Sequence, residues 1–142
     1  MEKGFTVTEV LIVLLIIFVS LAISLPLLNQ LQHQIVPSMT FAQLKGDLYY
    51  AQSVAINRQQ RVQVLYSYVD DRYLVRVPTT FQLLTEQTLP PDMDMYYGSL
   101  TSIDFLPNGN VSRFGTVTFR YQDSVWKLTT YIGKGRFRVQ KQ

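Results

Sequence analysis

The stretch from Phe5 to Leu28 reads FTVTEVLIVLLIIFVSLAISLPLL, an almost unbroken apolar run that contains one acid, Glu9, and one proline, Pro26. At about 1.5 Å of rise per residue, a helix over this run is roughly 36 Å long, enough to cross a hydrocarbon core of about 30 Å. A charged side chain inside it costs on the order of 3 kcal/mol, so an intramembrane carboxylate usually has a functional partner. We therefore predict a membrane helix with a functional acid; the alternative is a simple signal anchor.

The composition limits the chemistry that the rest of the chain can perform. About 110 of the 142 residues follow the apolar run, enough for one small domain beside a membrane anchor. The absence of cysteine excludes disulfides, thiolate metal sites and cysteine nucleophiles, and a single histidine, His33, excludes a multi-histidine metal site. We predict a protein that is not an enzyme and that uses no cofactor.

Charge is distributed unevenly along the chain. Residues 1–112 contain six Lys or Arg against nine Asp or Glu, a net charge of −3, whereas residues 113–142 contain seven against one, a net charge of +6. Such an asymmetry indicates association with an anionic partner but carries no information about the fold.

The residues before the apolar run, MEKG, are too few for the n-region of a secretory signal, and no A-x-A-like site follows the run, so we expect the run to stay in the mature protein. A basic residue and a glycine followed by F-T-x-x-E resembles the class III signal of type IV prepilins. The resemblance implies cleavage between Gly4 and Phe5 by a prepilin peptidase and methylation of the new amine on Phe5. Glu9 and Pro26 then occupy the fifth and twenty-second mature positions, in the register of that family.

The resemblance also implies how the apolar helix is used. In this family a fibre grows by adding subunits from the bilayer, and the glutamate of an incoming helix pairs with the cationic amine of a neighbour, which a low dielectric strongly favours over an unpaired carboxylate. Lys3 agrees with a single-pass topology, N-terminus cytoplasmic and C-terminus outside, that precedes transfer to a cell-surface pseudopilus. The implied partners are other major and minor pseudopilins, the prepilin peptidase and methylase, the assembly platform protein and its ATPase, and membrane lipid before assembly.

A second helical pattern follows the apolar run. Apolar residues recur at spacings of three and four, which places them on one helical face, at Phe41, Leu44, Leu48, Ala51 and Ala55. Pro26 and Pro37 each remove a helical hydrogen bond. We therefore predict one long helix from Thr6 to about Gln59, kinked or locally melted at both prolines.

After residue 60 the period of the pattern changes to two. We predict a hairpin over 62–68 and 73–77, an edge strand within 80–89, a loop at 90–92, and further strands over 102–106, 117–121, 126–132 and 136–139, with a tight turn at Gly109. The expected fold class is α+β, a type IV pilin-like fold whose long N-terminal helix, transmembrane in its first half, packs on a mostly antiparallel β-sheet. The expected segments are the leader 1–4, the transmembrane and assembly helix 5–28, its amphipathic continuation 29–60 and a β-rich globular domain 61–142.

Within the pilins, the globular part resembles the GspH and FimT-like minor pseudopilins, and the competence pseudopilins most. The resemblance rests on 48–56 with 62–65, on 105–109, on 114–117 and on 133–136. The chain departs from the pattern at Ala51-Gln52, where a typical member has Ala-Arg. The resemblance implies a minor pseudopilin of a competence machine that takes up DNA in natural transformation; the alternatives are a type II secretion pseudopilin and a membrane-anchored DNA-binding module that never enters a fibre.

The segment Gly135-Arg136-Phe137-Arg138 suggests a binding surface. In a strand, Arg136 and Arg138 point to one face and Phe137 to the other, with Lys134 and Lys141 nearby. Such cations can hold the phosphates of DNA in a sequence-independent, salt-sensitive way, and a Gly-Arg-x-Arg ending resembles that of DNA-binding members of the group. The alternative is a solvated basic edge that discourages edge pairing or that docks an acidic patch of a neighbouring pilin.

Overall fold

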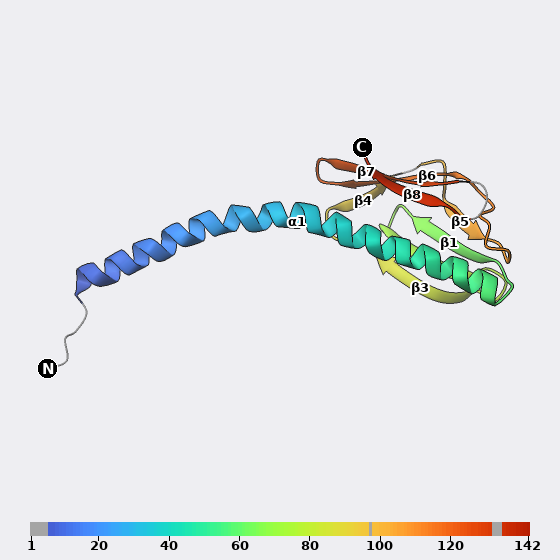
Figure 1. Ribbon diagram of the computed structural model, residues 1–142, viewed down its shortest axis with the longest axis horizontal. Coiled ribbons are helices and arrows are strands. Elements are labelled where there is room, and N and C mark those ends of the chain that lie inside the picture. Colours follow the sequence, from blue (N-terminus) through green and yellow to red (C-terminus); the bar gives the residue numbers. More distant parts are fainter. Residues whose placement is uncertain (1–5, 97, 132–134) are drawn as a thin grey trace. The chain divides into compact units, whose positions relative to one another are not determined.

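The computed structural model describes residues 6–96, 98–131 and 135–142, with residues 25–33 described in their backbone alone. The described chain forms one helix followed by eight antiparallel strands (Figure 1). Their bounds are α1 Val7–Asn57, β1 Val62–Ser67, β2 Arg72–Val77, β3 Gln82–Thr88, β4 Met93–Tyr96, β5 Ser102–Phe105, β6 Gly115–Tyr121, β7 Ser124–Thr130 and β8 Phe137–Lys141. The α+β fold class predicted from the sequence is confirmed.

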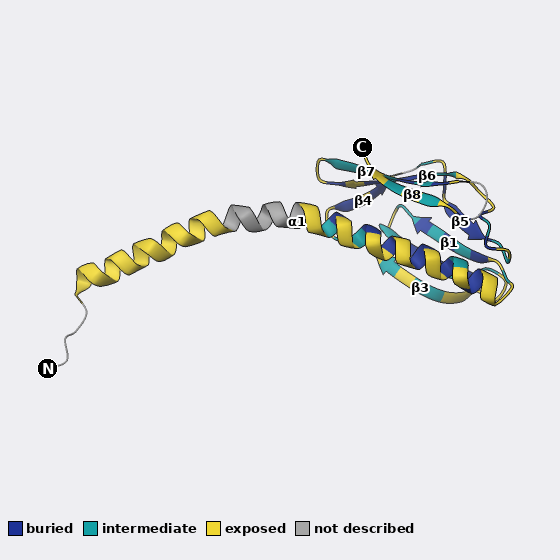
Figure 2. Ribbon diagram, viewed as in Figure 1, coloured by how far each residue is buried: buried dark blue, intermediate teal, exposed yellow. Residues whose placement is uncertain are grey.

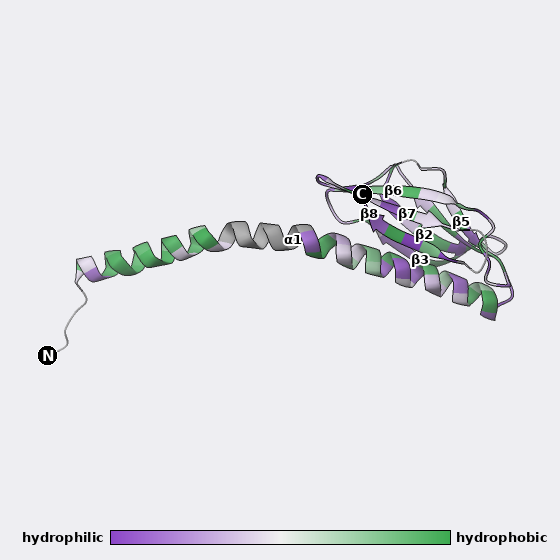
Figure 3. Cartoon of the chain, turned by 45° about the horizontal axis from the view of Figure 1, so that its top comes forward, coloured by the Kyte–Doolittle hydropathy of each residue, from purple (hydrophilic) through white to green (hydrophobic). Residues whose placement is uncertain are grey.

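The chain divides into two compact units, Met1–Ser38 and Met39–Gln142. In the first unit, every described side chain of α1 from Val7 to Ser24 is exposed, and this stretch is long and apolar enough to cross a membrane (Figures 2 and 3). Apolar side chains without any protein cover need a non-aqueous environment or a partner protein. The N-terminal part of α1 therefore has the properties of a membrane anchor.

The helix is not interrupted at either proline. Its backbone is helical from Val7 to Asn57, through Pro26 and Pro37, so the predicted local melting is wrong. A proline within a helix removes one hydrogen-bond donor, and the turns on either side can keep their own bonds.

In the second unit, the C-terminal half of α1 supplies one side of the hydrophobic core. Phe41, Leu44, Leu48, Ala51 and Ala55 are all at most 4% exposed, as the three-and-four spacing predicted. The Phe41 ring meets the rings of Phe119 at 5.4 Å and Trp126 at 5.0 Å between centroids. These contacts join the helix to the β6–β7 hairpin.

The strands form two four-stranded sheets, with the orders β3-β2-β1-β5 and β4-β6-β7-β8. The predicted hairpin is the β1–β2 pair, β3 is an edge strand as expected, and Gly109 takes a φ of 77° in the predicted turn. Strand β4 was missed, because Pro90 and Pro91 indicated a loop and the strand begins two residues later. Its addition to β6 makes the second sheet a separate four-stranded layer whose other edge is β8.

Candidate functional site

The acid of the apolar helix closes a capping box at the start of α1. The Glu9 backbone N–H donates to Thr6 Oγ1 at 3.3 Å, and the Thr6 N–H and hydroxyl donate to Glu9 Oε2 at 3.4 and 3.5 Å. This reciprocal pattern satisfies two donors of the first helical turn. No described lysine or arginine forms an ion pair with Glu9, so its charge is met here by neutral groups only.

The other predicted residues of the processing and assembly region are only partly described. Gly4 and Phe5 lie outside the described residues. Pro26 lies in the helical backbone of α1, and its side chain is outside the description. The expected roles of these three residues therefore stay predictions.

The basic residues of the last thirty positions lie in different surroundings. Arg113 lies 3.8 Å from the carboxylate of the buried Asp104. Lys141 lies with its Nζ 5.8 Å from the centre of the Trp126 ring. Arg136 and Arg138 are exposed on the opposite side of β8, and Lys134 falls outside the described residues.

Lys141, the last residue of β8, lies on the opposite face from Arg136 and Arg138. Strand β8 runs to Lys141 and pairs with β7 so that Phe137, Val139 and Lys141 stand opposite Thr130, Leu128 and Trp126. Side chains alternate between the two faces of a strand, so residues 137, 139 and 141 share the face that meets α1. The arginines take the other face.

Two further cations lie on the face of Arg136 and Arg138. Val117, Phe119 and Tyr121 of β6 are buried, so Arg120 is turned outward, and Lys127 stands between Thr118 of β6 and Gln140 of β8. We call Arg120, Lys127, Arg136 and Arg138 the cationic face. Sequence reasoning missed Arg120 and Lys127 because their position depends on the order β6-β7-β8, which no local pattern encodes.

The cationic face has a net positive charge. Asp94, opposite Arg120 on β4, is its one acid among the described strands of this sheet, and no described acid forms an ion pair with any of the four cations. The Arg120 guanidinium lies 4.5 Å from the centre of the Tyr96 ring, a cation–π contact. Such a surface attracts anions, with a strength that falls as salt rises.

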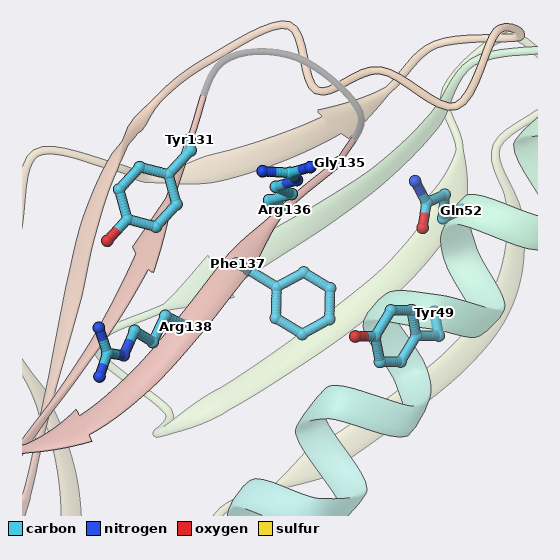
Figure 4. Close-up of a pocket in the computed structure, with 7 residues that line it drawn as sticks. All are labelled: Tyr49, Gln52, Tyr131, Gly135, Arg136, Phe137 and Arg138. Atoms are coloured by element: carbon cyan, nitrogen blue, oxygen red, sulfur yellow. The ribbon is translucent and has the colours of Figure 1, made fainter.

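A groove of about 740 Å³ runs along the start of β8, lined by Tyr49, Gln52, Tyr131 and residues 135–138 (Figure 4). Phe137 points toward Tyr49 of α1, with ring centroids 4.8 Å apart, whereas Arg138 points away from the helix, on the side of Tyr131. The backbone N–H of Tyr131 donates to the Arg136 carbonyl at 2.9 Å and extends the β7–β8 pairing beyond the strands themselves. The backbone that carries Arg136 and Arg138 is therefore held by the hydrogen bond to Tyr131 on one side and by the contact of Phe137 with Tyr49 on the other.

Gln52, the residue that departs from the family pattern, holds the start of β8. Its amide Nε2 donates to the Gly109 carbonyl at 2.8 Å and packs against Gly135. Gly135 has a φ of 61°, and a Cβ there would lie 2.8 Å from the Gly109 oxygen and would also collide with the Gln52 amide. The contact made by Gln52 is a neutral hydrogen bond, and only glycine fits at position 135 opposite it.

The two buried carboxylates of the globular unit have structural partners. Asp104 accepts hydrogen bonds from Arg61 at 2.5 Å and Gln63 at 2.9 Å, and Asp47 accepts one from the Tyr73 hydroxyl at 2.6 Å. Burial, and then the hydrogen bond to Asp47, raise the pKa of Tyr73 well above its usual value. Among the described residues no group of three or more His, Cys, Asp or Glu could hold a metal ion.

An exposed apolar helix that continues into a domain of antiparallel sheets defines a type IV pilin-like protein. The family model of the type II transport protein GspH matches residues 40–135, and the chain belongs to this family as a minor pseudopilin. It is 27% identical to the competence protein ComGD of Bacillus subtilis (strain 168) over 146 aligned positions, which cover 99% of this chain and 95% of that protein.

Solved structures share the fold. The minor pseudopilin EpsH of the type 2 secretion system of Vibrio cholerae superposes with a TM-score of 0.62 at 16% identity, over 74% of this chain and 96% of EpsH. The type IV minor pilin FimU of Pseudomonas aeruginosa superposes with a TM-score of 0.56 at 13% identity, over 70% of this chain and 84% of FimU. As a pseudopilin, the chain is a membrane-anchored subunit that assembles with other pilins in a pilus-like complex.

Proposed function

We propose that this minor pseudopilin is a structural subunit of a competence pseudopilus, the type IV pilus-like machine that takes up DNA in natural transformation. The observation that carries the proposal is the end-to-end similarity to a protein named for competence. The cationic face on the globular unit adds support, because a machine that handles DNA needs surfaces that attract phosphates. The first alternative, a type II secretion pseudopilin, is suggested by the family name and by the fold shared with EpsH.

In this proposal the chain passes through two environments. A prepilin peptidase removes residues 1–4 after Gly4, and the new amine on Phe5 is methylated. Residues 5–28 hold the subunit in the cell membrane with its N-terminus in the cytoplasm, and the helix continuation 29–60 and the β-rich domain 61–142 lie outside. The assembly platform protein and its ATPase then move the subunit into the cell-surface pseudopilus. No step requires catalysis or a cofactor from this chain.

Glu9 selects the docking position of the incoming helix. Among the described residues its carboxylate accepts hydrogen bonds only from the Thr6 N–H and hydroxyl, both at Oε2, and neither donor carries an opposite charge. A cationic amine of a neighbouring subunit offers a full opposite charge in a low-dielectric environment. Replacing the Thr6 donors by this amine as the partner of Glu9 favours the one register of the two helices in which the two charges meet. In the fibre, Pro26 marks the point at which the helix loosens.

The proposed contact with DNA uses Arg136 and Arg138, as the sequence indicates, together with Lys134. Arg120 on β6 and Lys127 on β7 extend the same contact across the sheet, because β7 lies between β6 and β8. Lys141 is left out of the proposed contact, since its ammonium group lies over the Trp126 ring on the helix side.

The experiment that tests the function is complementation of a deletion in the native host. We expect the deletion to abolish transformation by added DNA and to leave protein secretion unchanged, and the wild-type gene to restore transformation. Lost secretion with normal transformation would establish the type II secretion alternative instead.

The Glu9→Ala variant tests assembly in the same strain. It is expected to insert into the membrane normally, to be absent from sheared fibres and to fail to transform. Asp123→Asn, which removes an exposed acid from the β6–β7 turn, is the matched control and should behave as wild type. Normal transformation by the Glu9→Ala variant, with no subunit in the fibres, would point to a DNA-binding module outside the fibre.

A further inference from the structure

A second hollow, of about 530 Å³, adjoins the cationic face. It is lined by two aromatic residues, Phe114 and Tyr131, and by small or hydroxylated neighbours at Ser99, Gly115, Thr116, Thr129 and Thr130. Tyr131 also lines the groove that contains Arg136 and Arg138. Tyr131 therefore borders both the uncharged hollow and the groove that contains the guanidinium groups of Arg136 and Arg138.

The two aromatic residues are unusually open to solvent for their size. Phe114 is 66% exposed and Tyr131 is 48% exposed, although the inward positions of β6 and β7 beside them are buried. Large apolar rings that lie together on a surface are commonly binding sites, since they lose water contact when a ligand covers them. The alternation of β7 directs Tyr131 to the same side as Thr129 and Lys127.

The segment 99–100 packs against Gly115 and Thr116 at the floor of the hollow. The Thr116 N–H donates to Ser99 Oγ at 2.9 Å, and the Leu100 N–H donates to the Thr116 carbonyl at 3.3 Å. The segment 99–100 passes so close to Gly115 that a Cβ there would lie 2.5 Å from Ser99 Oγ and 2.6 Å from Leu100 Cγ. Contacts of Ser99 and Leu100 with Gly115 and Thr116 therefore form the hollow before any ligand arrives.

We propose that this hollow receives an unpaired nucleobase, and that the cationic face holds the phosphates that flank it, so that the sheet prefers single-stranded or frayed DNA to closed duplex. Stacking of bases on exposed aromatic rings beside a cationic track is the usual way in which proteins hold single strands. In a closed duplex the bases are stacked on one another, so duplex can use the cations but not the hollow. The inference rests on the proposed contact with DNA and names the form of DNA that is bound.

Charge favours DNA over a peptide as the occupant. The lining of the hollow is uncharged, and the four cations stand to one side of it along β6, β7 and β8. A ligand that fills both parts must combine a flat apolar ring with repeated anions at its sides. A nucleotide chain has this combination at every unit, whereas a peptide has it only for particular sequences.

The test uses the full-length protein in nanodiscs of zwitterionic lipid, titrated with a labelled 20-nucleotide oligothymidine and, separately, with a blunt 20-base-pair duplex. Phe114→Ala is expected to weaken binding of the single strand by about 5- to 160-fold, from the usual contribution of one stacked base, and to leave duplex binding unchanged. Phe114→Tyr should restore single-strand binding. Phe81→Ala, which removes another exposed phenylalanine beside the other sheet, is the matched control and should change neither affinity.

The outcomes separate this inference from the proposed function. If Arg136→Ala with Arg138→Ala weakens both ligands while Phe114→Ala weakens neither, DNA contact stands and the nucleobase hollow is wrong. Equal weakening of both ligands by Phe114→Ala also overturns the preference for single strands. If Phe114→Ala changes only the cross-linking of the subunit to another pilin, the hollow is a protein docking site and the inference fails, whatever the transformation assay shows.

Discussion

Removing two arginines from the cationic face should weaken the salt dependence of DNA binding by an amount that follows from the number of phosphates contacted. Each phosphate neutralised on duplex DNA contributes about −0.9 to the slope of log affinity against log salt concentration. If each of Arg120, Lys127, Arg136 and Arg138 meets one phosphate, the wild-type slope is about −3.6, and Arg136→Ala with Arg138→Ala lowers its magnitude to about 1.8. Between 50 and 200 mM salt, wild-type affinity then falls by about 150-fold and that of the double variant by about 12-fold.

The assay is fluorescence anisotropy with the blunt duplex and the full-length protein in zwitterionic nanodiscs, at several salt concentrations. Lys141→Ala is the matched control, because it removes a cation from the same strand but from the face that meets α1. We expect its slope to equal that of wild type. Arg120→Ala with Lys127→Ala should lower the slope as much as the β8 pair does, since both pairs lie on one face.

The reasoning about the cationic face would be refuted by either of two results. A slope that is unchanged in the Arg136 and Arg138 double variant means that these arginines meet no phosphates. A slope that falls equally in Lys141→Ala means that binding follows total charge rather than the outward face of β8. Circular dichroism of each variant should match wild type, because all four cations of the face are outside the core.

Two further predictions concern stability, measured by chemical denaturation of the globular signal. Gly135→Ala should destabilise the protein by about 1 to 3 kcal/mol, because the positive φ and the close contacts of Gly135 both exclude a Cβ. Gly46→Ala is the control: this helical glycine has open space around it, so the substitution should stabilise the protein by up to about 1 kcal/mol. Equal effects of the two substitutions would contradict the account of the Gly135 contact. Tyr73→Phe should lower the free energy of unfolding by about 1 to 3 kcal/mol, because it removes the hydroxyl that donates to the buried Asp47. Tyr66→Phe should be neutral or slightly stabilising, because the buried Tyr66 hydroxyl has no hydrogen-bond partner among the described residues. Burial raises the pKa of both tyrosines, so the folded state keeps them neutral while the same tyrosines of the unfolded chain ionise above about pH 10. The free energy of unfolding should therefore be constant below that pH and fall above it. The fall should be less steep in Tyr66→Phe, which lacks one of the two groups.

The elements that sequence reasoning placed correctly depend on local periodicity. The buried face of α1 at Phe41, Leu44 and Leu48 follows from the helical repeat, and the β1–β2 hairpin follows from a repeat of two on each side of a polar turn. Both signals lie within short windows of sequence. The long apolar helix is equally local, because hydrophobic length alone identifies it.

The errors concern places where distant segments meet. Strand β4 was hidden behind Pro90 and Pro91, and it exists because its alternating methionines can be buried when it pairs with β6. The predicted last strand ended at Val139, and its extension to Lys141 follows from pairing with β7, which carried that lysine to the helix side.

The role of Gln52 required the same long-range information. Its sequence position showed only that a family charge was missing. The hydrogen bond to Gly109 and the contact with Gly135 join residues that are far apart in the chain. Half of the cationic face was missed for this reason as well, since Arg120 and Lys127 share a face with Arg138 only through the order of the strands.

The alternation of side chains along residues 136–141 separates two kinds of position within six residues. Phe137 and Val139 are half-buried on the helix side of the domain, so changes there alter stability. Arg136, Arg138 and Gln140 are exposed, and substitutions at these positions leave the core untouched. A pilin with this edge can therefore change what its surface recognises by mutation at alternate positions, while the scaffold that presents them stays the same. A shift of β8 by one residue would abolish that separation, and the close fit of Gly135 against Gln52 is what holds the strand in register.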